Sequence, residues 1–157
     1  MNAIDTSTRQ IRDLADKFEI TELVHRLGRA LDEGDWDELA ALYTADATAR
    51  TPGGLAVGRR ALVTQASRNH FPDRRIQHVI SGILVDLDGD TATVRANLVV
   101  IFAWGPAQDP SLGAQPRLTL GEVYRFDAVR TTEGWRFSSV ASNPVWSVGT
   151  RPQPAAA

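Results

Sequence analysis

The spacing of the apolar side chains changes once along this 157-residue chain, near Arg75. From about residue 8 to 33, apolar residues recur mostly three or four positions apart, which predicts an amphipathic helix with one buried stripe. The stripe consists of Ile11, Leu14, Phe18, Leu23, Leu27, Ala30 and Leu31. After Arg75 the period is two, which is typical of β-strands. Helices followed by a run of strands favour an α+β fold, with the helices on one face of a curved antiparallel sheet.

Turn and capping residues predict the bounds of these elements. Gly34 ends the first helix, and Asp35 is a suitable N-cap for a short helix through about Ala45. Another short helix fits residues 59–69. Strands are expected at roughly 75–87, 90–104, 117–129 and 134–147, with a longer loop at GPAQDPSLGAQP. We expect one domain over residues 1–150 and a disordered tail at 151–157.

Composition and short motifs exclude several classes of function. A net charge of −2 argues against a nucleic-acid surface, and the chain has no cysteine for a disulfide or a thiolate metal site. His25, His70 and His78 lack metal-ligand spacing, so no metal is expected. No phosphate-binding loop offers a seat to a nucleotide or flavin, so no cofactor is expected either. The N-terminus has no apolar signal core and no run approaches a membrane span, which makes the cytoplasm the expected location.

One carboxylate falls in an apolar row of the third predicted strand. Alternation places Glu122 on the same face as Leu118, Leu120, Tyr124 and Phe126. Burial of a lone carboxylate costs several kcal/mol by order of magnitude. Glu122 should therefore be paired, protonated or at a wet opening.

Asp32 and His78 each have a structural and a chemical interpretation. A carboxylate in the last turn of a helix opposes the helix dipole at a cost of roughly 0.3–1 kcal/mol, so Asp32 is either a solvated acid or has a compensating partner. A strand histidine such as His78 is more often structural than catalytic, although pocket histidines are the usual general bases.

Three segments carry a resemblance to a known family. LDEGDWDEL, RRIQHVISG and GWRFSSVASNPVW resemble, in order and separation over about residues 10–147, scytalone dehydratase and its relatives in the SnoaL-like branch of the nuclear transport factor superfamily. The resemblance implies a cone: a curved sheet around a pocket, closed by helices. It also implies a homo-oligomer, a trimer or otherwise a dimer.

The resemblance further implies site residues. The family's catalytic acid matches Asp32, the histidine that pairs with it matches His78, and a polar pair on the penultimate strand matches Glu122 and Tyr124. Two tyrosines that hold the substrate carbonyl in scytalone dehydratase match Leu31 and Thr51, so that reaction cannot run here in the same way. Other candidate substrate contacts are Phe102 and Trp104, at the end of an inward row, and Asn143, for which a turn role is equally compatible with the sequence.

The predicted function is that of a cofactor-free lyase or isomerase acting on a small, largely apolar cyclic substrate, as in polyketide or other secondary metabolism. His78, oriented by Asp32, would remove a proton, a first step shared by elimination of water, double-bond migration and aldol-type cyclisation. The alternative is a non-catalytic ligand-binding or assembly module, since fold does not fix function. A small subunit of a ring-hydroxylating oxygenase is a third, less favoured possibility, because such subunits are usually longer.

Overall fold

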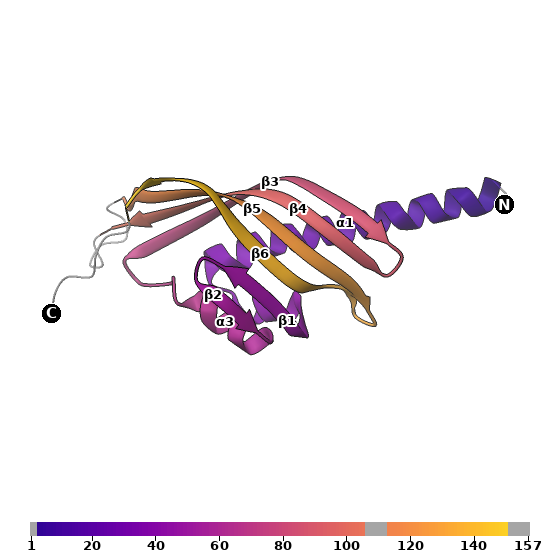
Figure 1. Cartoon of the computed structure of the whole chain (residues 1–157), viewed down its shortest axis with the longest axis horizontal. Helices are drawn as coiled ribbons and strands as arrows, with labels where there is room; N and C mark the ends of the chain where they lie inside the picture. The colour runs from indigo at the N-terminus through magenta and orange to yellow at the C-terminus, as the bar shows by residue number, and fades with distance from the viewer. Residues whose placement is uncertain (1–2, 106–112, 151–157) are drawn as a thin grey trace.

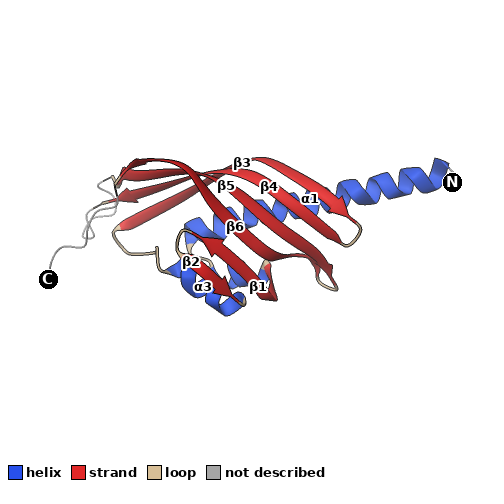
Figure 2. Ribbon diagram, in the orientation of Figure 1, coloured by secondary structure: helices blue, strands red, loops and turns tan. Residues whose placement is uncertain are grey.

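The computed structural model describes residues 3–105 and 113–150, which form helices on one face of a bent sheet (Figures 1 and 2). The predicted tail at 151–157 and most of the predicted loop at 105–116 lie outside the described residues. The elements are α1 (Ala3–Glu33), α2 (Trp36–Ala41), β1 (Tyr43–Thr51), β2 (Gly54–Val57), α3 (Arg59–Ser67), β3 (Arg74–Asp88), β4 (Thr91–Trp104), β5 (Gln115–Thr131) and β6 (Gly134–Gly149).

The sheet is mixed and has the strand order β2-β1-β6-β5-β4-β3. The four long strands β3 to β6 form an antiparallel meander, as the alternation of apolar residues predicts. The expected antiparallel sheet is present in these four strands, and β1 departs from it by pairing parallel to β6. Two parallel neighbouring strands require a long connection between them, and residues 52–133 connect β1 to β6.

The sequence prediction lacks the hairpin of β1 and β2, because it extends the second helix through about Ala45. α2 ends at Ala41, and the strand begins at Tyr43. Its buried residues are Tyr43, Ala47 and Ala49, so the inward row is made of small side chains with one aromatic. Such a row gives a weak apolar alternation, and the partner strand that stabilises it is distant in sequence.

Helix α1 is only partly covered by the sheet. Ile20, Leu23, Val24 and Leu27 are completely or almost completely buried. The first half of the predicted stripe is not buried: Ile11, Leu14 and Phe18 have exposed fractions of 67, 68 and 69 %. Figure 1 shows the reason, because the N-terminal part of α1 extends past the end of the sheet at the β3–β4 turn. No helix in the described ranges is both long and apolar enough for a membrane span.

A partly buried ion pair joins α1 to the end of β5. Arg130 donates two hydrogen bonds to Asp16, at 2.8 Å to Oδ1 and 2.6 Å to Oδ2, and the Trp135 indole donates a third to Oδ1 at 3.1 Å. The hydrogen bond from Arg130 is the main cause that holds the pKa of Asp16 below its usual value.

Candidate active site

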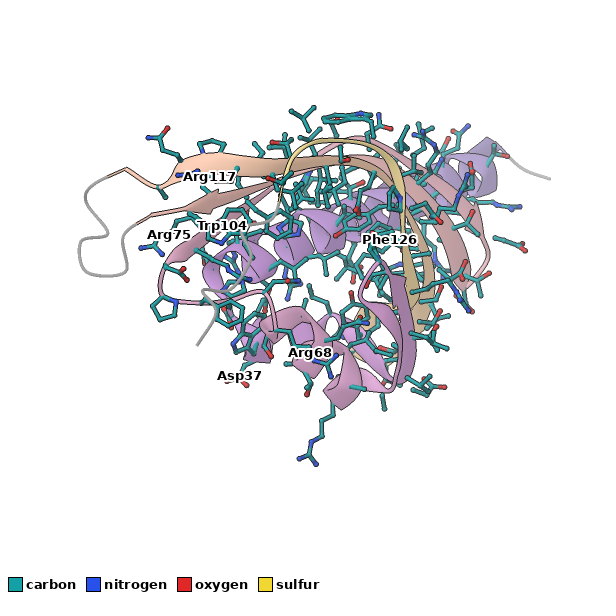
Figure 3. The ribbon with its side chains drawn as sticks, turned by 60° about the vertical axis from the view of Figure 1, so that its left-hand side comes forward. Asp37, Arg68, Arg75, Trp104, Arg117 and Phe126 are labelled. Carbon is teal, nitrogen blue, oxygen red and sulfur yellow. The ribbon has the colours of Figure 1, made fainter. Side chains whose placement is uncertain are left out.

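A cavity of about 590 Å³ lies between the helices and the sheet. Its walls come from α1, α2, α3 and all of the long strands, and most of the lining side chains are apolar. Figure 3 shows the side chains around it, with Trp104 and Arg75 toward one end of the molecule and Phe126 toward the other. A cavity of this size with a mostly apolar surface and several polar groups is typical of a small-molecule site.

Asp32 and His78 meet at the wall of this cavity. The Asp32 Oδ1 atom lies 2.7 Å from His78 Nδ1 and also accepts a hydrogen bond of 2.8 Å from the His78 backbone N–H. The two side chains are 26 and 12 % exposed, respectively. The predicted contact between the last turn of α1 and β3 is therefore present.

Local structure explains how two residues 46 positions apart come together. β3 is the last strand in the sheet order, so one edge of it has no strand neighbour, and α1 lies along this strand. Gly28 permits the close approach, since a Cβ atom there would lie 3.1 Å from Ile80 Cδ1. The Asp32 carboxylate can then accept from an edge N–H that no strand pairs.

The contact assigns the tautomer of His78. A proton on Nδ1 is shared with the carboxylate, so Nε2 carries the free lone pair in the neutral ring. His78 lines the cavity, whereas Asp32 is not among the residues that line it. The arrangement is that of a general base on the cavity wall with an acid behind it that fixes its orientation.

Glu122 and Ser142 form a second polar pair on the sheet. Both side chains are buried, both line the cavity, and Ser142 Oγ donates a hydrogen bond to Glu122 Oε2. Glu122 shares its face with Leu118, Tyr124 and Phe126, as the alternation predicts. The carboxyl group is thus paired and also faces the cavity.

Two phenols line the cavity, and they are the only tyrosines of the chain. Burial raises the pKa values of both Tyr43 and Tyr124 well above the ordinary phenol value. Electrostatic interactions with Tyr43, Glu122 and Asp32 raise the pKa of Tyr124 further. Both phenols stay neutral near neutral pH and can donate hydrogen bonds.

Tyr43 and His70 are cavity residues that sequence reasoning missed. Tyr43 lies on the strand taken for a helix, and the alternation of Tyr43, Ala47, Ala49 and Thr51 is the signal that could have identified it. His70 lies in the loop between α3 and β3. Its Nε2 donates to the Leu31 carbonyl at 2.6 Å, and the ring packs edge-on against Trp36 at 4.8 Å.

Most of the other predicted contacts also face the cavity, but two do not. Leu31, Thr51 and Phe102 are lining residues, while Trp104 and Asn143 are not. Trp104 follows a register shift in β4 and packs against Phe102, with ring centroids 6.1 Å apart. Asn143 is exposed and donates to the Val123 carbonyl at 3.4 Å, because Ser142 takes the inward position on β6.

The described residues contain no group of three His, Cys, Asp or Glu side chains placed to hold a metal ion. The polar groups that face the cavity include the His78 ring, the buried Glu122–Ser142 pair and two phenols. Together they can take a proton from carbon and stabilise charge on an oxygen or a leaving group.

The comparisons with known proteins agree with this architecture. A SnoaL-like domain model matches residues 12–141. An uncharacterized protein from Mycobacterium tuberculosis is 31 % identical over 141 residues, which cover 85 % of this chain and 88 % of that protein.

Two solved structures show the same fold. An NTF2-like protein with a cystatin-like fold from Novosphingobium aromaticivorans is 27 % identical, with a TM-score of 0.73 over 90 % of each chain. The type 2 hexachlorocyclohexane dehydrochlorinase LinA is 17 % identical, with a TM-score of 0.75 over 93 % of this chain and 98 % of that one. The α+β cone implied by the resemblance is thus confirmed, and the chain belongs to the SnoaL-like family of the NTF2-like fold.

Proposed function

We propose that this protein is a lyase or isomerase that needs no cofactor and acts on a small, largely apolar cyclic compound. The observation that carries the proposal is the 2.7 Å contact between Asp32 Oδ1 and Nδ1 of His78, a residue that lines the cavity. A protein that only binds a ligand has no need of this pair. The resemblance to scytalone dehydratase supports a ring compound of secondary metabolism as the substrate.

The proposed first step is removal of a proton from carbon. His78 Nε2 takes a proton from a carbon next to a carbonyl group or next to a carbon with a leaving group. Asp32 stabilises the imidazolium ion that forms. The electron pair left on carbon forms a double bond, either to the carbonyl carbon as an enolate or to the adjacent carbon as the leaving group departs.

Tyr124 and Tyr43 are the proposed hydrogen-bond donors to the atom that gains charge. Each donor held in a dry site contributes several kcal/mol of transition-state stabilisation by order of magnitude. The pair would replace the two tyrosines of scytalone dehydratase, whose positions here are Leu31 and Thr51. LinA, which has the same fold, is described as a dehydrochlorinase, and its name supports elimination as one possible outcome of the shared first step.

The test follows the proton rather than a particular product. A cyclic ketone such as 2-tetralone is incubated with the protein in deuterium oxide, and loss of the α-proton signal is followed by NMR. We expect exchange above the buffer rate, lost in His78→Ala and retained in His25→Ala. His25 is a suitable matched control because its side chain is exposed. In the described part of the chain, its ring pairs with Glu22 alone.

Exchange that persists unchanged in His78→Ala would contradict the proposed role of this residue. If no panel of activated ring compounds exchanges, yet the cavity binds such compounds, the ligand-binding module is the better description.

A further inference from the structure

The opening of the cavity lies between the β1–β2 turn and the segment that joins α3 to β3. Pro52, Gly53, Arg68 and Phe71 line the cavity and are also exposed. Arg74, the first residue of β3, lines the cavity beside them and is partly buried. A guanidinium group therefore stands close to the point at which a ligand enters.

Arg74 is held by two aromatic rings. Its guanidinium carbon lies 4.0 Å from the ring centroid of Phe71 and 5.5 Å from that of Trp104. Stacking uses the faces of a guanidinium group and leaves its N–H groups free to donate in the plane. The Nε atom is buried and has no hydrogen-bond partner in the described part of the chain.

No described residue accepts a hydrogen bond from the Arg74 Nη groups either, and these are not among the buried unpaired atoms, so they are the donors that a ligand oxygen can reach. Among the described residues that line the cavity, Glu122 is the one acid, and it is hydrogen-bonded to Ser142. Arg74 and His78 share one face of β3, four positions apart, which is about 13 Å along a strand. The cation and the base therefore lie at different parts of one cavity.

We infer that Arg74 binds an anionic oxygen group of the substrate, such as a carboxylate, at the end of the molecule away from the reacting carbon. The inference rests on the proposed function in taking this cavity as the substrate site, and it narrows the substrate class to apolar ring compounds with an acidic group. Arg74 would recognise the anion with in-plane N–H donors, while the apolar walls hold the ring.

The test compares two ligands that differ in charge but hardly in shape. Binding of 2-naphthoate and of its neutral amide is measured by isothermal titration calorimetry at neutral pH. We expect the wild-type protein to bind the carboxylate tighter by about tenfold or more, the size of effect that charge-assisted hydrogen bonds give. Arg74→Gln should remove this preference and leave the affinity for the amide within about twofold of wild type.

Two control variants separate the explanations. Arg75→Gln removes the neighbouring exposed guanidinium, which donates to the Pro72 and Arg74 carbonyls, and should keep the preference. His78→Ala should also keep it, so anion binding can be measured even if the protein catalyses no exchange. Three results would overturn the inference. The wild type could bind both ligands equally, the preference for the carboxylate could survive Arg74→Gln, or it could be lost in His78→Ala instead. An equal loss of both affinities in Arg74→Gln would also overturn the inference, because that result indicates only a packing role.

Discussion

Asp32 Oδ1 accepts two hydrogen bonds from the same residue, one from the His78 ring and one from the His78 backbone. The backbone bond holds the carboxylate in position independently of the ring. Loss of the His78 ring therefore leaves the carboxylate bound to the backbone, and an Asp32 substitution that keeps an oxygen can retain the backbone bond.

The first prediction concerns this pair acting as one unit. Asp32→Asn keeps an oxygen for the backbone N–H but removes the charge that orients and stabilises the ring. Asp32→Asn and His78→Ala should each lower the proton-exchange rate by about 10²–10⁴-fold, with little change in melting temperature. The double variant should lose hardly more than either single variant, because residues that act together are non-additive. Losses that multiply in the double variant would show that the two residues act separately.

A second prediction concerns the alkaline titration of the two tyrosines, which their own absorbance reports. Because burial raises the pKa values of Tyr43 and Tyr124, the folded protein should show no tyrosinate absorbance at about pH 11, whereas the urea-unfolded chain should titrate near the ordinary value of about 10. Their contribution to stability is complete below about pH 10 and is lost as the pH rises toward the folded-state pKa values. The free energy of unfolding should fall by up to about 1.4 kcal/mol per pH unit for each tyrosine.

Tyr43→Phe and Tyr124→Phe are the controls for that titration. Each should remove part of the alkaline dependence. A normal titration of both phenols in the folded protein would show that they are solvated.

The third prediction concerns the attachment of α1. Asp16→Asn should lower the free energy of unfolding at neutral pH by about 2–3 kcal/mol, because it leaves a partly buried Arg130 and the Trp135 indole with a weaker acceptor. The pKa of Asp16 is lowered, so its contribution is present above the ordinary carboxyl pKa and is lost as the pH falls through the folded-state value. Chemical denaturation at several pH values measures both effects.

Asp90→Asn is a matched control, because Asp90 accepts from the same arginine at 2.8 Å but is 73 % exposed. An exposed ion pair contributes little to stability. Equal losses in the two variants would contradict the importance of the buried partner.

The fourth prediction concerns assembly. We expect a homo-oligomer, a trimer or otherwise a dimer, in which the exposed stripe of Ile11, Leu14 and Phe18 is covered. Light scattering should give a multiple of the 17.1 kDa chain mass, and Leu14→Lys with Phe18→Lys should shift the mass toward the monomer. A monomer mass for the wild type at micromolar concentration would contradict the expectation.

The fifth prediction concerns metals. EDTA should leave the proton-exchange rate unchanged, because His78 and Asp32 provide the base and its orientation without a metal-bound water. Loss of exchange with EDTA, and its return with a divalent ion, would contradict the proposed chemistry.

Local patterns in the sequence predict the parts of this structure that local patterns stabilise. The four long strands and the face of Glu122 follow from alternation alone, and Asp35 caps α2 by accepting from the Glu38 N–H at 3.1 Å. Local patterns do not predict strand β1, because its inward row is mostly alanine and its main partner, β6, is distant in sequence. The exposure of Phe18 is not predicted either, because periodicity identifies an apolar stripe on a helix but not how far the sheet covers that stripe.

In the candidate site, too, local patterns do not predict contacts between distant segments. The contact of Asp32 with His78 was implied by resemblance, since neither residue type alone distinguishes a base from a structural histidine. Asn143 was misplaced by one position, and in a strand one position reverses the face. Tyr43 could be recognised as a cavity residue only after the element that carries it had been identified.

The parallel pairing of β1 with β6 also constrains the order of assembly. β1 is separated from the meander it joins by some of the longest sequence intervals in the chain, so this closure is expected late, after the local β3–β6 hairpins. Tyr43 and Thr51 approach Val140 and Ser142 only in that step. A chain in which β6 has not yet joined β1 would therefore have Asp32 on α1 but would lack the part of the cavity wall that these two strands form.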